Sequence, residues 1–181
     1  VHCGDHSRAV KVFGEQQAFR RELLNARLLR GNAVFVQLLD WSESARILEF
    51  EWLPRVGLPV RPDEFAIHLA RVHSAVRWLP PAAVHIARSV AVSPGESSER
   101  PVDRESLSCA ILDLKPGHCG RRATHNGPLV QLDLESLTFG ADPLLDVAAT
   151  AGMFGLDVSG ASWRRFLALY REELRAQGME W

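Results

Sequence analysis

The sequence has no long apolar run, few cysteines and almost no net charge. No apolar stretch approaches the roughly 18 residues that a membrane-spanning helix needs, and the N-terminal VHCGDHSRAV lacks the apolar core of a signal peptide. Acidic and basic residues nearly cancel, with a formal net charge of -1, so the basic surface of a nucleic-acid-binding protein is not expected. The sequence therefore predicts a cytoplasmic protein that binds neither a membrane nor nucleic acid.

The three cysteines, Cys3, Cys109 and Cys119, are an odd number without CxxC spacing. This pattern is typical of a reducing compartment rather than of a disulfide-rich scaffold. Cys109 and Cys119 could join His118 and His125 in a metal site, although their spacing fits no standard zinc module. A metal-stabilised interaction domain is therefore one alternative to an enzyme.

The N-terminal part of the chain shows strand and helix patterns in turn. Residues 8–13, RAVKVF, alternate as a strand does, and an amphipathic helix follows that ends at Gly31-Asn32. Its expected apolar stripe is formed by Phe19, Leu23, Ala26 and Arg30. The apolar segments VFVQLLDW and RILEFEWL, separated by the polar SESA, predict an antiparallel hairpin. Residues 54–62 contain several Pro and Gly and are expected to form a linker.

The rest of the chain is mainly helical by pattern, interrupted by short strands. A helix is expected to carry Phe65, Leu69, Val72 and Val76 and to end before Pro80. Residues 84–108 are rich in Ser, Glu and Pro and predict a mobile loop or a substrate-facing insertion. Asn126-Gly127 favours a two-residue hairpin turn. GADPLLDVAATAG predicts a helix capped by Asp142, and the last helix is expected to bury Trp163, Phe166, Leu167, Tyr170 and Leu174.

Two acidic residues end apolar segments that a turn should bring together. Asp113 follows CAIL and Asp133 follows LVQL, and two carboxylates in one cleft need a cation or a proton to coexist. A divalent metal bound to a phosphate meets that need. Upstream, Lys11 points out of a strand and Glu22 lies in the middle of the next helix, so the glutamate could hold the lysine as a fixed positive charge for a phosphate. A lysine, a metal-binding acid and a base are the parts that phosphoryl transfer requires.

These segments resemble the aminoglycoside-phosphotransferase branch of the protein-kinase-like superfamily, which also contains choline kinase-type and homoserine kinase-type enzymes. RAVKVF and FRRELLNARLLRGNAVFVQLLDW resemble its lysine strand and the helix and strand that follow, and RILEFEWLP resembles its hinge. ILDLKPGH is similar to the catalytic loop H-G-D-x-x-x-x-N, QLDLES to the metal-binding I-D-W-E, and GADPLLDVA to G-D-P-x-x-D-L-A. The resemblance implies an α+β, bilobal kinase-like fold, with a small β-rich N-lobe at residues 1–53 and a helical C-lobe at residues 54–181.

The resemblance also implies an ATP-dependent phosphotransferase that uses Mg²⁺ or Mn²⁺ and transfers the γ-phosphate to a hydroxyl of a small molecule or a protein. For the nucleotide, the resemblance implies Lys11 as the lysine that binds ATP, Glu22 as its ion-pair partner, and Glu51, Trp52 and Leu53 as the hinge. For catalysis, it implies Asp113 as the base and Lys115 as the residue that neutralises charge on the transferred phosphoryl group. It also implies Asp133 and His118 as metal ligands and Asp146 as a residue that supports the catalytic loop.

Three features depart from the family pattern. Ile111 and Leu112 stand where the catalytic loop has histidine and glycine, which removes the usual support of the aspartate. His118 replaces the metal-binding asparagine, and an imidazole favours softer ions than magnesium, such as manganese or zinc. A Gly-rich phosphate loop should precede Lys11, but only VHCGDHS stands there. Because the first residue is Val1, a missing N-terminal segment is expected, and the loop is either part of that segment or never existed.

The departures keep a second function open, that of a catalytically impaired pseudokinase or nucleotide-binding interaction module. Each motif also has an ordinary structural explanation. DLKPGH can be a Pro-Gly turn with solvated charges, Lys11 and Glu22 can be surface residues, and Asp146 can simply favour the first turn of a helix. Metal-dependent turnover separates the enzyme from the binding module.

Overall fold

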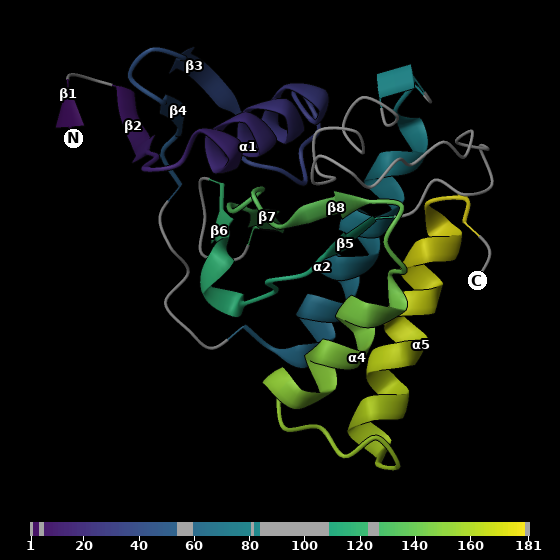
Figure 1. Cartoon of the computed structure of the whole chain (residues 1–181). Helices are drawn as coiled ribbons and strands as arrows, with labels where there is room; N and C mark the ends of the chain where they lie inside the picture. The colour runs from purple at the N-terminus through teal and green to yellow at the C-terminus, as the bar shows by residue number, and fades with distance from the viewer. Residues whose placement is uncertain are drawn as a thin grey trace.

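The computed structural model describes residues 2–3, 6–53, 60–80, 82–83, 109–122 and 127–179 (Figure 1). The strands are β1 His2–Cys3, β2 His6–Val12, β3 Leu38–Ser42, β4 Ile47–Glu51, β5 Cys109–Ile111, β6 Cys119–Arg121, β7 Leu129–Gln131 and β8 Leu137–Phe139. The helices are α1 Gln16–Leu28, α2 Pro62–Ala75, α4 Leu144–Met153 and α5 Ala161–Ala176, with short 3₁₀ turns at Val76–Trp78 and Pro116–His118. Within these ranges no helix is both long and apolar enough to span a membrane.

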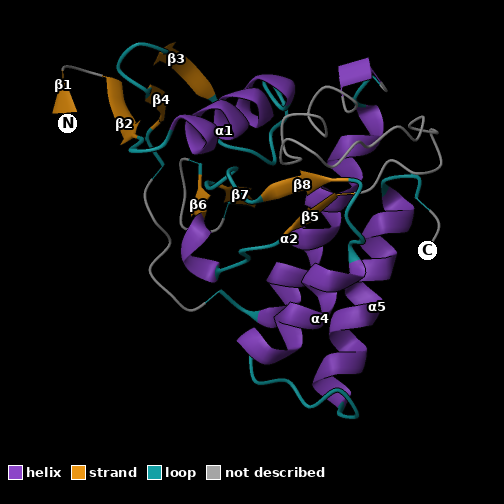
Figure 2. Ribbon diagram, in the orientation of Figure 1, coloured by secondary structure: helices purple, strands orange, loops and turns teal. Residues whose placement is uncertain are grey.

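The first lobe is a four-stranded sheet with one helix. Its strands run in the order β1-β2-β4-β3, all pairs antiparallel, and Lys11 lies opposite Leu48. The alternating β2 and the hairpin β3–β4 are as the sequence predicted. Figure 2 shows α1 packed beside this sheet. The stripe of α1 differs at its end, because the helix stops at Leu28 and Leu29 is buried, whereas Arg30 is exposed.

The segment before β3 pairs outside its own lobe. The sequence predicted a strand from Val34 onward, but β3 begins only at Leu38. The Val36 N–H donates to the Gln131 carbonyl (2.9 Å), and the Gln131 N–H donates to the Val34 carbonyl (2.8 Å), with Phe35 bridging Gln131 in parallel. The backbone of residues 34–36 therefore extends the C-terminal hairpin instead of the N-terminal sheet.

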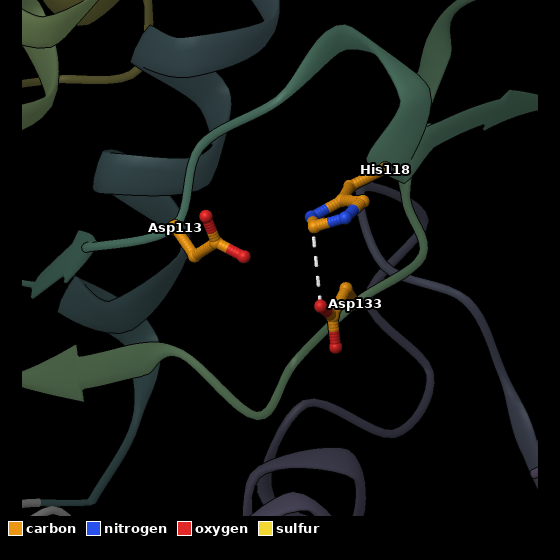
Figure 3. A group of neighbouring side chains, drawn as sticks. All are labelled: Asp113, His118 and Asp133. Atoms are coloured by element: carbon orange, nitrogen blue, oxygen red, sulfur yellow. Dashed lines mark ion pairs between the residues drawn. The ribbon is translucent and has the colours of Figure 1, made fainter.

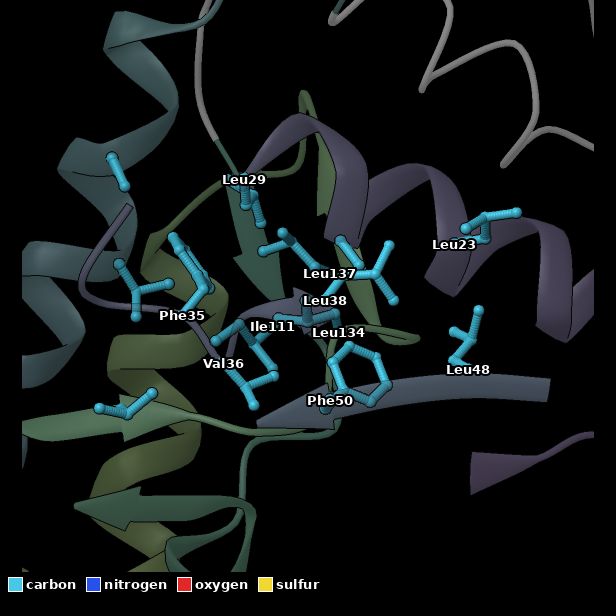
Figure 4. Close-up of a cluster of buried hydrophobic side chains, with 14 of the residues drawn as sticks. Leu23, Leu29, Phe35, Val36, Leu38, Leu48, Phe50, Ile111, Leu134 and Leu137 are labelled. Atoms are coloured by element: carbon cyan, nitrogen blue, oxygen red, sulfur yellow. The ribbon is translucent and has the colours of Figure 1, made fainter. Parts of the chain in front are cut away.

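The second lobe is helical. α2 and α5 pack along each other, and α4 lies beside them (Figure 1). Their buried face includes Phe65, Leu69, Val147, Phe166, Tyr170 and Leu174, whereas Trp163 and Leu167, predicted to be buried, are only partly so. The apolar residues of the first lobe form a separate cluster (Figure 4), which continues into Ile111, Leu134 and Leu137.

Two short hairpin-like pairs lie between the lobes. β5 pairs with β8, and β6 pairs with β7. The predicted hairpin is confirmed by the pairing of β6 with β7, in which Arg121 lies opposite Leu129, whereas the two-residue turn predicted at Asn126-Gly127 falls partly on residues outside the described ranges. Residues 123–126, the predicted linker at 54–59 and the predicted loop at 84–108 lie outside the described residues. The lobe boundary at residue 53 therefore stays a prediction.

Candidate active site

Strand pairing places His118 beside Asp133. In the antiparallel pair β6–β7, Cys119 lies opposite Gln131, so the residue before β6 and the residues after β7 meet at one end. The Leu132 N–H donates to the His118 carbonyl (2.8 Å) and continues this pairing. As a result, His118 Nδ1 lies 3.5 Å from Asp133 Oδ2 (Figure 3).

The second strand pair brings Asp113 to the same place. Ile111, the last residue of β5, lies opposite Leu137, the first residue of β8, so the loop after β5 adjoins the loop before β8. Asp113 lies in the first of these loops and Asp133 in the second. One ligand atom from each of Asp113, His118 and Asp133 lies within 4.8 Å of the other two (Figure 3).

Asp113 is the exposed member of the group, and Lys115 accompanies it. The Lys115 Nζ donates to the Asp113 carboxylate at 2.7 Å, and the two side chains are 58% and 51% exposed. This hydrogen bond lowers the pKa of Asp113 below its ordinary value, so the carboxylate is ionised near neutral pH. Asp113 therefore offers an accessible hydrogen-bond acceptor in the loop.

Lys11 reaches the group from the first lobe. Its Nζ lies 2.5 Å from Glu22 Oε2, 3.0 Å from Asp133 Oδ1 and 3.7 Å from Glu135 Oε2. Glu22 is fully buried, and burial raises its pKa to about 7 despite the attraction of the lysine. Burial alone would lower the pKa of Lys11, but the carboxylates of Glu22 and Asp133 outweigh it and raise that pKa. The ammonium is thus a fixed positive charge beside Asp133.

Asp146 contacts the backbone next to Asp113. It lies at the start of α4, is buried, and its Oδ2 accepts the Ile111 N–H (2.5 Å). The same oxygen lies 3.0 Å from His73 Nε2, and His73 Nδ1 lies 2.7 Å from the Tyr170 hydroxyl. A carboxylate, an imidazole and a phenol from three helices therefore hold the end of β5.

The predicted hinge lies at the far end of β4 from the lysine. Lys11 is paired with Leu48, and Glu51 is three residues further, which is about 10 Å along a strand. The Glu51 N–H donates to the Gln37 carbonyl (3.0 Å), so this donor is already used within the protein. Of the other two hinge residues, Trp52 is half-exposed and Leu53 is buried, and the assignment of all three to the hinge stays a prediction.

The departures from the family pattern have distinct structural consequences. Ile111 is fully buried in the apolar cluster with Leu134 and Leu137 (Figure 4), while Leu112 is exposed.

Within the described ranges, no cysteine belongs to a group of side chains that could hold a metal. Burial raises the pKa of the Cys119 thiol to about 12 and raises that of Cys109 as well, which disfavours the thiolate that a metal needs.

Three residues of this region were not identified from the sequence. Glu135 belongs to a second group of potential ligands with Glu22 and Asp133, and its place two residues after Asp133 was the available signal. His73 is buried, and its Nε2 lies 3.0 Å from Asp146 Oδ2. Arg122 donates to the Glu51 carboxylate and to the carbonyls of Ala33 and Phe35.

The donor set fits a divalent cation. Asp133 supplies carboxylate oxygens, which hard cations prefer, while the nearby Asp113 carboxylate is bonded to Lys115. His118 Nδ1 is buried and makes no hydrogen bond, an arrangement that costs free energy unless a partner binds there. Because imidazole is a good ligand for manganese and later metals, the set suits Mn²⁺ at least as well as Mg²⁺.

The chain resembles several solved structures, two of which are structures of a choline kinase. The crystal structure of choline kinase LicA from Streptococcus pneumoniae superposes with a TM-score of 0.64 at 17% identity, over 93% of this chain and 69% of that chain. The structure of LicA in complex with AMP gives a TM-score of 0.61 at 17% identity, over 94% of this chain and 68% of that chain. No protein-family model and no curated protein sequence matches.

The likeness shows the fold. The chain has the predicted α+β, bilobal kinase-like architecture, with a small β-rich lobe and a helical lobe. At 17% identity the comparison shows the fold alone, and it does not single out the aminoglycoside-phosphotransferase branch that the motifs resemble.

Proposed function

We propose that the protein is an ATP-dependent phosphotransferase that moves the γ-phosphate to a hydroxyl group of a small molecule or a protein. The observation that carries the proposal is the convergence of Lys11, Asp113, His118 and Asp133, which come from both lobes of a kinase-like fold. The AMP complex of the choline kinase supports nucleotide binding by this fold. The motifs favour the aminoglycoside-phosphotransferase branch, and the buried free thiols of Cys109 and Cys119 favour the cytoplasm.

On the nucleotide side, Lys11 would orient the α- and β-phosphates while Glu22 keeps its Nζ in place. Asp133 and His118 would hold Mg²⁺ or Mn²⁺, with Glu135 close enough to assist. The metal would neutralise charge on the phosphates. The adenine would contact the chain segment of Glu51, Trp52 and Leu53, where β4 ends.

On the acceptor side, Asp113 would accept a hydrogen bond from the attacking hydroxyl and align it with the γ-phosphate. Because its pKa is lowered, Asp113 would take the proton late, after the bond to phosphorus has formed. Lys115, 2.7 Å from this carboxylate, would neutralise charge on the transferred group. Asp146 would keep the loop in position through the Ile111 N–H.

The test is phosphate transfer from ATP to a panel of alcohols, aminoglycosides and proteins, with Mg²⁺, Mn²⁺ or no metal. Transfer should require a metal and should be lost in Asp133→Asn, while an exposed α5 variant, Arg165→Ala, retains it. Equal turnover in Asp133→Asn and the wild type would remove the proposal.

A second candidate is a nucleotide-binding module without turnover. Ile111 in the apolar core and His118 in place of an asparagine favour it. Metal-dependent ATP binding without transfer to any acceptor would identify this function.

A further inference from the structure

A buried asparagine lies in the last turn of α1. Asn25 is only 2% exposed, although asparagine is a weak helix former and a buried amide costs free energy unless it is hydrogen-bonded. It lies three residues after Glu22, which is one turn along the same face of the helix. A buried amide at this position therefore needs a hydrogen-bond partner.

The partner is the loop that carries Asp133. Asn25 Nδ2 donates to the Leu134 carbonyl at 2.8 Å and to the Leu137 carbonyl at 3.0 Å. Leu134 directly follows Asp133. Leu137 lies opposite Ile111, and Ile111 is two residues before Asp113. One side-chain amide therefore holds both ends of the turn that joins Asp133 to β8.

α1 thus makes two connections to the site from adjacent turns. Glu22 binds the Lys11 ammonium, and Asn25 binds the backbone that follows Asp133. The contact of Asn25 is uncharged and buried, so neither a change of pH nor an incoming cation competes for it directly. Movement of α1 would move the lysine and the metal-binding loop together.

We propose that Asn25 is a positioning residue that ties α1 to the Asp133 loop and so sets Asp133 for the cation bound with the nucleotide. The consequence for the cation rests on the proposed function. The tie between the helix and the loop rests on the contacts alone.

The direct test is Asn25→Leu, which keeps the side chain's approximate size and removes both donors. ATP affinity is measured by calorimetry with Mn²⁺, with Mg²⁺ and without metal. The gain in affinity on adding metal should fall about tenfold, because two buried carbonyls lose their partner beside Asp133. The metal-free affinity should change by less than about twofold. An unchanged metal-dependent gain would overturn the proposal.

The matched control is Leu23→Ala, which removes a buried side chain from the same helix and leaves both donors in place. It should lower the free energy of unfolding and keep the gain in ATP affinity that the metal gives. The same loss of gain in both variants would mean that Asn25 acts only by stabilising α1. If Asn25→Leu does not fold, Asn25→Ser, which keeps one donor, should show an intermediate loss, and a full gain in that variant would overturn the proposal.

Hydrogen exchange separates this inference from the proposed function. If the wild type binds ATP without any metal-dependent gain, the metal role fails with the proposed function, and the helix-to-loop tie is still measurable. In Asn25→Leu, the amides of Leu112 and Leu137, which bond to Ser136 and Leu134, should exchange about tenfold faster relative to those of α5, but not in Leu23→Ala. Unchanged relative exchange would overturn the tie itself.

Discussion

Asp113 and Asp133 lie together but are held in different ways. Asp133 is 24% exposed, and its carboxylate is already bonded to Lys11 and adjacent to His118. Asp113 is 51% exposed, and its carboxylate bonds to the exposed Lys115. The difference indicates that one acid is prepared in advance for a charged partner, whereas the other is left accessible to an arriving group.

The supports of the two acids also come from different lobes. Asp133 depends on β2 and α1 of the first lobe, through Lys11 and Asn25. The backbone before Asp113 depends on α2 and α4 of the second lobe, through His73 and Asp146. Each lobe therefore supports one of the two acids, so the position of the pair depends on both lobes.

The largest expected effect concerns turnover. Asp113→Asn should lower the transfer rate by about 10²–10⁴-fold, because it removes the hydrogen-bond acceptor for the hydroxyl proton. ATP affinity with metal should stay within about threefold of the wild type, since Asp133 and Lys11 are untouched. Steady-state kinetics and calorimetry check both expectations. An equal loss of rate and affinity would contradict the separation of the two acids.

The support of Asp113 should affect stability. Asp146→Ala leaves the buried His73 Nε2 and the Ile111 N–H without their shared partner, so the free energy of unfolding should fall by about 1–3 kcal/mol for each of these groups. Urea denaturation measures this. The matched variant Asp142→Ala removes an exposed acceptor of the Leu144 N–H in the same segment and should cost about 1 kcal/mol. Similar losses of unfolding free energy in both variants would contradict a supporting role of Asp146 beyond that of an ordinary surface hydrogen bond.

The support of Asp133 should show in the pH dependence of stability. The pKa of Glu22 is raised from 4.5 to about 7, so between these values the folded protein keeps a proton that the unfolded chain has released. The free energy of unfolding of the wild type, relative to Glu22→Gln, should therefore fall by up to about 3 kcal/mol as the pH rises from 4.5 to 7, and level off above 7. Denaturation curves at several pH values test this, and a constant difference between the two proteins would contradict it.

The smallest effect is expected outside the site. Arg165 pairs with Asp63 at 2.8 Å, with side chains 70% and 38% exposed. Arg165→Ala should change the free energy of unfolding by less than about 1 kcal/mol and should leave turnover unchanged, because water screens the pair. Thermal unfolding and the transfer assay check this. A large effect would show that surface charge, and not the two supports, governs the site.

Local sequence patterns predicted many of the strands and helices and most of the charged residues that lie together at the candidate site. Alternation predicted β2 and the β3–β4 hairpin, and motif spacing pointed to Asp113 and Asp133. Lysine was an additional signal: the chain has two lysines among 21 basic residues, Lys11 and Lys115, and both lie at this site. A lysine ammonium contacts a phosphate as a compact point charge, whereas an arginine guanidinium does so through a planar fork.

What the sequence could not predict depends on contacts between distant segments. The backbone of residues 34–36 looks like a strand, but its partner is Gln131, far along the chain. Asn25 and His73 are polar residues on helices, and only the packing of other elements decides that they are buried. Arg30 continues the helical period, but the helix ends before it.

The most direct test of the two-acid account is ATP binding by calorimetry, with Mg²⁺, Mn²⁺ or no metal, for the wild type, Asp133→Ala and Asp113→Asn. We expect metal to strengthen binding in the wild type and in Asp113→Asn, and to have no effect in Asp133→Ala. The same metal-dependent gain in Asp133→Ala as in the wild type, or no gain in any of the three proteins, would contradict the account.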